Sequence, residues 1–163
     1  MDLPIRKRNR LENFDYSENR AYFITICTHG KKQNLSKIVV GDGFPVPKLT
    51  SVGKIVSAFT EKIPEKYPTV SIEKYVVMPD HIHLLILFNG DDGGTGNPSP
   101  TIGTVIGWFK YQTTKAVNDY RKTTAERFWQ RSYYDHVIRN EQDFAEIYHY
   151  IEFNPQRWVE KRK

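Results

Sequence analysis

Hydrophobic and polar positions follow two alternating patterns along this chain. Short runs rich in β-branched and aromatic residues are typical of strands, whereas apolar residues at i, i+3, i+4 and i+7 are typical of helices. The first pattern predicts strands at 20–28, 70–78, 81–88 and at the end of 128–138. The second pattern predicts helices at 51–63, 101–120 and 141–153.

Glycine and proline indicate where these elements stop. We expect a turn at 30–32, a helix end at Pro64 and another at Pro155, because proline lacks the N–H of a continuing helix. Residues 35–48 contain two glycines and two prolines, which allows a short irregular hairpin at most. Residues 89–100 contain four glycines and two prolines, which predicts a flexible surface loop.

The predicted elements follow the order strand, helix, two strands, helix, strand, helix. This order indicates the α+β class, with a ferredoxin-like antiparallel sheet and helices packed on one side of it. A chain of 163 residues has the size of one domain. We therefore expect a basic N-terminal arm at 1–19, a single domain at 20–155 and a basic C-terminal tail at 156–163.

Composition excludes several classes of protein. Hydrophobic residues make up 39% of the chain and charged residues 26%, which is typical of a globular protein and not of a disordered one. No apolar run approaches the roughly 20 residues that span a bilayer, and no apolar signal segment is visible near the start. The single cysteine, Cys27, excludes an internal disulfide framework. We expect a soluble, cytoplasmic protein.

The net charge of +5 is concentrated in particular segments. Residues 1–10 and 156–163 each have a net charge of +3, and residues 101–139 have a net charge of +4. Such basic segments favour a polyanion partner such as nucleic acid, although solvated tails and helix faces have the same composition. The candidate DNA-binding residues are Arg6, Lys7, Arg8, Arg10, Lys110, Lys115, Arg127, Arg131 and Arg139.

Two histidines open the strand predicted at 81–88. Because side chains alternate between the faces of a strand, His81 and His83 project from one surface while Ile82 and Leu84 face the core. Two imidazoles at i and i+2 can reach one metal ion. The alternative is a pair of half-buried histidines that are hydrogen-bonded locally.

The last predicted helix carries a second pair of candidates. Its apolar stripe includes Tyr148, which we expect in the core, whereas Tyr150 and Asn154 lie four residues apart on the margin of the stripe. Tyr150 has a phenol oxygen that can act as a nucleophile, and Asn154 has a carbonyl oxygen suited to a divalent ion. The alternative is that Tyr150 only packs and that Asn154, next to Pro155, only ends the helix.

Together these groups suit phosphodiester chemistry with a protein nucleophile. Such chemistry needs a hydroxyl aimed at phosphorus and a cation on the phosphate oxygens. Two neutral imidazoles and one amide leave a bound Mg²⁺ or Mn²⁺ with its full charge. A tyrosine ester conserves the energy of the broken strand, because its phenol, with a pKa near 10, is a better leaving group than a sugar hydroxyl.

Three ordered segments resemble the motifs of a known family. YVVMPDHIHLL at 75–85 resembles the metal-binding segment of the single-tyrosine HUH transposases, which include the insertion-sequence type and the REP-associated tyrosine transposases. FWQRSYYDHVIRN at 128–140 is similar to the second family signature, and YIEFNP at 150–155 to the nucleophile helix. The resemblance covers about residues 5–158 and implies the HUH nuclease fold.

The resemblance also implies roles for individual residues and an activity. His81, His83 and Asn154 would be the ligands of Mg²⁺ or Mn²⁺, and Tyr150 the nucleophile. The implied activity is cutting and rejoining of single-stranded DNA, next to a hairpin, through a 5′-phosphotyrosine in a prokaryotic, nucleoid-associated protein. A homodimer and a monomer are both compatible, although no glycine hinge for helix exchange follows Gly107.

Two other functions are compatible with the same residues. One is a domesticated protein of the same fold that binds single-stranded nucleic acid without cutting it. The other is a hydrolytic metal phosphodiesterase, in which water attacks and Tyr150 only packs. The intact set of four candidate residues favours the transposase over the binder.

Overall fold

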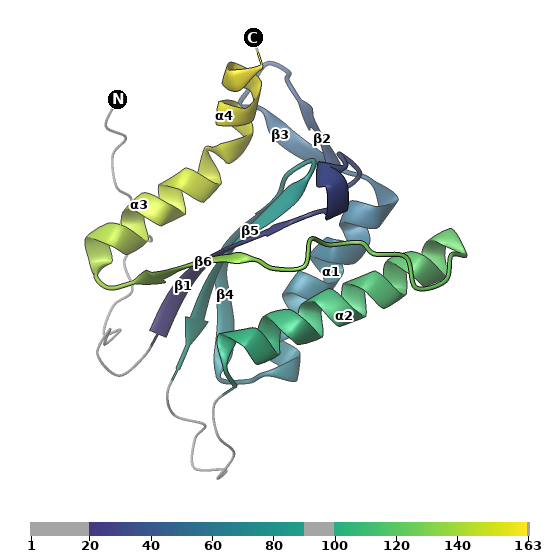
Figure 1. Ribbon diagram of the computed structural model, residues 1–163. Helices are drawn as coiled ribbons and strands as arrows, with labels where there is room; N and C mark the ends of the chain where they lie inside the picture. The colour runs from purple at the N-terminus through teal and green to yellow at the C-terminus, as the bar shows by residue number, and fades with distance from the viewer. Residues whose placement is uncertain (1–19, 90–99, 163) are drawn as a thin grey trace.

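The computed structural model describes residues 20–89 and 100–162, which form a four-stranded antiparallel sheet with helices on both faces and a separate two-stranded hairpin (Figure 1). The sheet has the strand order β4-β5-β1-β6. Its strands are β1 (Arg20–Cys27), β4 (Val70–Val77), β5 (His81–Phe88) and β6 (Tyr134–Ile138). The helices are α1 (Ser51–Lys66), α2 (Ile102–Arg121), α3 (Glu141–Glu152) and α4 (Asn154–Lys161). The predicted ferredoxin-like order β1-α1-β4-β5-α2-β6 is confirmed.

The helices occupy both faces of the sheet, not one as expected. Ile82, Leu84 and Ile86 pack in a core with the buried side chains of α1 and α2. The alternate residues of β5 point the other way, and Leu85 and Leu87 share a second core with residues of α3. Because β1 and β5 are apolar on both faces, a sheet covered on one face only would leave this second set in water.

The first helix contains a proline in its last turn and does not end there. α1 continues past Pro64 to Lys66, contrary to the predicted end, because a proline in the last turn removes only one helical hydrogen bond. The helical hydrogen-bond pattern resumes after the proline, since the Tyr67 N–H donates to the Ile63 carbonyl at 2.9 Å.

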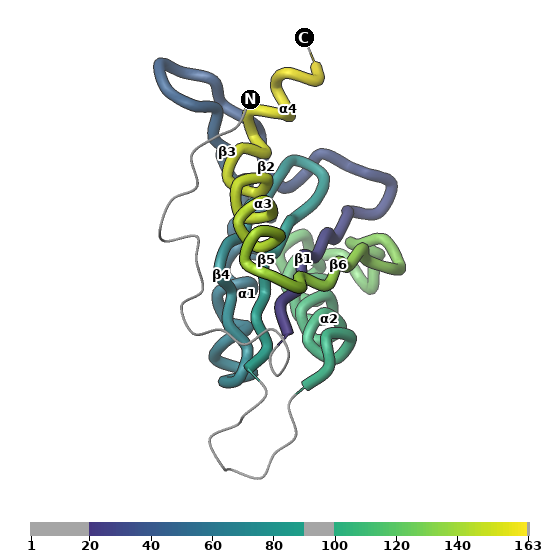
Figure 2. Tube along the Cα trace, turned by 90° about the vertical axis from the view of Figure 1, so that its left-hand side faces the viewer, coloured from purple at the N-terminus to yellow at the C-terminus, as the bar shows by residue number. Residues whose placement is uncertain are grey.

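The segment predicted as a basic tail after Pro155 is a helix. α4 begins at Asn154, so Pro155 lies in its first turn, where no N–H donor is needed. Phe153 ends α3 and also precedes α4, so that the two helices are joined by a bend at one residue (Figure 2). Pro155 therefore marks a change of direction and not the end of helical structure.

The predicted hairpin forms beside α4. Strands β2 (Ser36–Val39) and β3 (Val46–Leu49) pair antiparallel, and both contact α4. A short 3-10 turn at His29–Lys31 leads into this region from β1. The segment 1–19, with Arg6, Lys7, Arg8 and Arg10, and most of the loop predicted at 89–100 lie outside the described residues. Within the described ranges, no helix has the length and apolar character needed to cross a membrane.

α1 begins where it touches the segment before β2. The Thr50 hydroxyl accepts the Gly53 N–H at 3.0 Å and donates to the carbonyl of Asn34 at 2.7 Å. A Cβ on Gly53 would lie 1.9 Å from the Leu35 carbonyl oxygen, closer than any van der Waals contact. Only glycine permits this approach of helix and chain.

We expect Gly53→Ala to lower the free energy of unfolding by about 1–3 kcal/mol, since the backbone must move to admit the methyl group. Gly107→Ala is the matched control, because a Cβ there meets nothing within 4 Å and the residue lies inside α2. The control should gain about 0.5–1 kcal/mol from helix propensity. Urea unfolding followed by circular dichroism measures both, and an equal change in the two variants would contradict the packing argument.

Candidate functional site

The two histidines meet on the sheet face that α3 covers. Strand alternation directs His81 and His83 to one side, as predicted, and their Nε2 atoms lie 3.1 Å apart. His83 is buried, with 5% of its surface exposed, and Phe23 of the neighbouring strand stacks on its ring at 5.1 Å. The pair is therefore held in place by the sheet itself.

The other nitrogen of each ring has its own partner. The Nδ1–H of His81 donates to the Asp80 carboxylate at 2.6 Å, because an ionised carboxylate can only accept. His83 Nδ1 lies 2.8 Å from the hydroxyl of Thr25, its register partner on β1. A threonine hydroxyl both donates and accepts, so His83 can adopt either tautomer. Both Nε2 atoms can thus turn a lone pair toward a common point.

His83 is a neutral imidazole over the physiological pH range. Burial, followed in size by the like charge of the neighbouring His81, lowers the pKa of His83 to about 3. Metal binding requires the neutral form, so His83 would release no proton on binding a metal. The burial that disfavours a charged imidazole thereby keeps this nitrogen in the form that binds metals.

Tyr150 of α3 lies against the histidine pair within the same chain. Its ring centroid is 5.5 Å from that of His83 and 5.7 Å from that of Phe23. Tyr148, two residues earlier, is buried in the core, as predicted. Tyr150 is half-buried and keeps part of its surface accessible. A phenol and two imidazoles from distant parts of the sequence therefore converge.

α4 adds three side chains to this site. Asn154 is buried, and its amide donates to the Tyr150 carbonyl at 3.5 Å. One helical turn later, the ring centroid of Trp158 lies 6.2 Å from that of His81. The Arg157 guanidinium carbon lies 5.2 Å from the centroid of the Tyr150 ring. Because residues one turn apart share a face, Asn154 belongs to the face of α4 that is turned toward the histidines.

The donor set fits a divalent cation. Two ligands at right angles on an octahedral ion, each at about 2.1 Å, are about 3.0 Å apart, close to the separation of the two Nε2 atoms. Among the described residues, no group of three His, Cys, Asp or Glu side chains forms a metal cluster. Asn154, which the sequence analysis predicted as the third ligand, carries an amide oxygen on the adjacent helix face.

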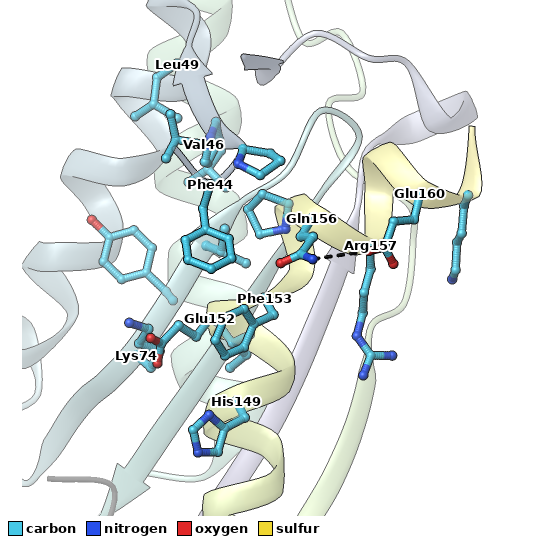
Figure 3. A pocket seen from close by; sticks show the side chains of 18 of the residues that line it. Phe44, Val46, Leu49, Lys74, His149, Glu152, Phe153, Gln156, Arg157 and Glu160 are labelled. Carbon is cyan, nitrogen blue, oxygen red and sulfur yellow. Dashed lines mark hydrogen bonds between the residues drawn. The ribbon is translucent and has the colours of Figure 1, made fainter. Parts of the chain in front are cut away.

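A cavity of about 1090 Å³ adjoins this site and shares Arg157 with it. Figure 3 shows Phe44 and Val46 on one side of the cavity, and His149, Phe153 and Arg157 of the two C-terminal helices on the other. Neither the two histidines nor the tyrosine nucleophile candidate line it. The candidate site is therefore identified from the distances between its side chains and not from the volume of the cavity.

Four of the predicted DNA contacts are exposed in the structure, and a fifth is engaged elsewhere. The exposed side chains are Lys115, Arg127, Arg131 and Arg139. The Lys110 ammonium instead donates to the carbonyls of Gln130 and Arg131, at 2.7 and 3.1 Å. Burial lowers the pKa of Lys110. This lysine fastens the segment before β6 to α2, and its predicted contact with DNA stays a prediction.

We expect Lys110→Met to lower the free energy of unfolding by about 1–3 kcal/mol, because two carbonyls lose a charged donor. Lys115→Met, on the exposed side of the same helix, should change it by less than about 0.5 kcal/mol. Chemical denaturation of both variants measures the difference. Equal stability of the two variants would show that the Lys110 hydrogen bonds do not hold the segment.

Comparison with known proteins assigns the family. Residues 49–154, more than half of the chain, match the family of IS200-like transposases. The chain therefore belongs to the IS200-like transposases, and the predicted relationship to single-tyrosine transposases is confirmed. The fold is the HUH fold of that family.

Relatives and solved structures agree with this assignment. An uncharacterised protein of Haemophilus influenzae is 32% identical over 94% of this chain and 89% of its own length. A second protein of that organism, named provisionally as a REP-associated tyrosine transposase, is 29% identical over 86% of this chain and 73% of its own length.

Two solved structures share the fold. A REP-associated tyrosine transposase bound to a REP hairpin has a TM-score of 0.61 at 21% identity, over 90% of this chain and 73% of that chain. A Deinococcus radiodurans protein, provisionally described as a transposase, has a TM-score of 0.54 at 18% identity, over 88% of this chain and 95% of that chain.

Proposed function

We propose that this chain is a metal-dependent transposase that cuts and rejoins single-stranded DNA through a 5′-phosphotyrosine at Tyr150, and that it recognises hairpin DNA. The observation that carries the proposal is the convergence of Tyr150 with His81 and His83 in a member of the IS200-like family. The hairpin partner is supported by the fold shared with a transposase bound to a REP hairpin.

In this proposal His81, His83 and Asn154 hold Mg²⁺ or Mn²⁺. Asp80 and Thr25 orient the imidazoles through their Nδ1 atoms, the arrangement by which outer partners support metal-binding histidines. When bound, the ion would supply the positive charge that polarises the scissile phosphate.

Tyr150 acts as a reversible nucleophile. Its Oη forms a bond to phosphorus, the bond from phosphorus to the 3′-oxygen breaks, and the phenolic proton passes to solvent. The released 3′-oxygen takes up a proton. Attack by a second 3′-hydroxyl on the phosphotyrosine reverses these steps and reseals the strand, so no nucleotide cofactor is required.

The exposed basic residues would bind the phosphate backbone of the DNA. Within the described ranges, no ion pair with a carboxylate involves these exposed residues, which are Lys115, Arg127, Arg131 and Arg139. Contacts of this kind make affinity fall steeply with salt, without setting sequence preference. The arm residues named in the sequence analysis stay predictions.

We expect Tyr150→Phe to form no covalent adduct with DNA, since the attacking oxygen is gone. The assay incubates the protein with Mn²⁺ and a pool of hairpin oligonucleotides with randomised single-stranded flanks, then counts adducts that survive denaturing electrophoresis. Tyr148→Phe is the matched control, because that ring lies in the core, and it should retain adduct formation within about threefold.

Each outcome of this assay separates the candidate functions. An adduct with Tyr150→Phe would disprove the nucleophile. Tight binding without cleavage by the wild type would point to a non-cleaving binding protein. Cleavage that survives Tyr150→Phe without an adduct would point to a hydrolytic phosphodiesterase.

We expect His81→Ala to weaken Mn²⁺ binding at least tenfold, because one of the three proposed protein ligands is lost. His81 lies outside the two buried cores, so its removal leaves no large core cavity. Isothermal titration with Mn²⁺, without DNA, measures the affinity. His29→Ala, at an exposed histidine of the 3-10 turn, is the control. Equal affinity in His81→Ala and wild type would remove His81 from the ligand set.

A further inference from the structure

Arg157 stands over the nucleophile candidate without an ionic partner. Its guanidinium carbon is 5.2 Å from the centroid of the Tyr150 ring. The side chain is exposed and also lines the cavity beside α4, where Figure 3 shows it extending away from the bonded pair Gln156 and Glu160. Among residues 20–89 and 100–162, no carboxylate forms an ion pair with this arginine.

The bend between α3 and α4 creates this placement. Asn154 and Arg157 lie three residues apart on one face of α4, and the bend at Phe153 brings the Arg157 guanidinium over the ring of Tyr150 in α3. The backbone N–H of Arg157 donates to the Phe153 carbonyl at 3.1 Å. This hydrogen bond fixes the Cα of Arg157 relative to the bend. The charge is therefore directed at the tyrosine by the backbone.

The contact with the ring is the weaker of two available interactions. A guanidinium above a partly exposed aromatic ring gains a modest stabilisation, whereas a guanidinium that donates two N–H groups to a phosphate forms strong, charge-assisted hydrogen bonds. A phosphodiester brought to the Tyr150 oxygen would therefore draw Arg157 from the ring face. The long side chain reaches from one position to the other by rotamer changes.

We propose that Arg157 is a further catalytic residue, which donates N–H groups to a non-bridging oxygen of the scissile phosphate while Tyr150 attacks it. This inference rests on the proposed function. As the Tyr150 oxygen bonds to phosphorus and the 3′-oxygen leaves, the phosphoryl group gains negative charge, and the phenolic proton goes to solvent. A guanidinium bonded to that oxygen stabilises the charge more in the transition state than in the ground state.

The alternative role for Arg157 is a general grip on the DNA backbone. The two roles predict different kinetics, because a backbone contact changes the DNA concentration required, whereas a contact made to the reacting phosphate changes the rate at saturating DNA. Measuring the single-turnover rate of adduct formation against DNA concentration separates them. The DNA used is the hairpin oligonucleotide recovered in the wild-type adduct.

We expect Arg157→Gln to lower the saturating rate of adduct formation by about 10–100-fold, with the half-saturating DNA concentration changed less than about threefold. Arg157→Lys should recover part of the rate, because it keeps the charge but not the bidentate geometry. Arg121→Gln is the matched control, since Arg121 also lies over an aromatic ring, 5.7 Å from the centroid of Phe128. It should react within twofold of wild type.

Three results would overturn the inference. The first is a saturating rate of Arg157→Gln within twofold of wild type. The second is a defect confined to the half-saturating concentration. The third is a thermal unfolding midpoint lowered equally in Arg157→Gln and Arg157→Lys, with equal loss of rate. Failure of the proposed function is distinct from these, because wild type would then form no adduct or Tyr150→Phe would form as much as wild type.

Discussion

The antiparallel pairing of β1 with β5 determines where the groups of the site can be. Its register sets Thr25 opposite His83, so that the hydroxyl meets the imidazole and Phe23 stacks on the same ring. A shift of one residue would turn the histidines into the core under α1 and α2 and expose Leu84 to the other face. Since β5 is buried on both sides, such a shift has nowhere to place polar rings, and the register is strongly specified.

Helix α3 covers the second face of the sheet, and this packing both stabilises the fold and positions the nucleophile candidate. α3 buries Tyr148 against the sheet and, by the same docking, presents Tyr150 to His83. The apolar stripe sets the distance of the phenol from the imidazoles, so the geometry of the site depends on core packing and not on a loop. A helix that is fixed by its own buried face can hold a reactive group more rigidly than a surface segment can.

Part of this site is visible in the sequence, and part is not. Strand alternation is a local rule, so the common face of His81 and His83 could be predicted from residues that are neighbours in the chain. Helical periodicity likewise separated Tyr150 from the buried Tyr148. Thr25 could not be identified as a partner of His83, because that contact depends on strand register. The side of the sheet that α3 covers was not predicted. The helix after Pro155 was not predicted either, because proline occurs both after the end of a helix and in the first turn of the next one.

Phe153 joins α3 to α4, so the position of the α4 residues in the site depends on the number of residues at this joint. The nucleophile candidate precedes the joint by three residues, and the amide candidate follows it directly. One residue inserted there would rotate everything downstream by about 100°, carrying Asn154 and Arg157 together away from the imidazoles. Under the proposed function, the number of residues at this joint therefore matters as much as their identity.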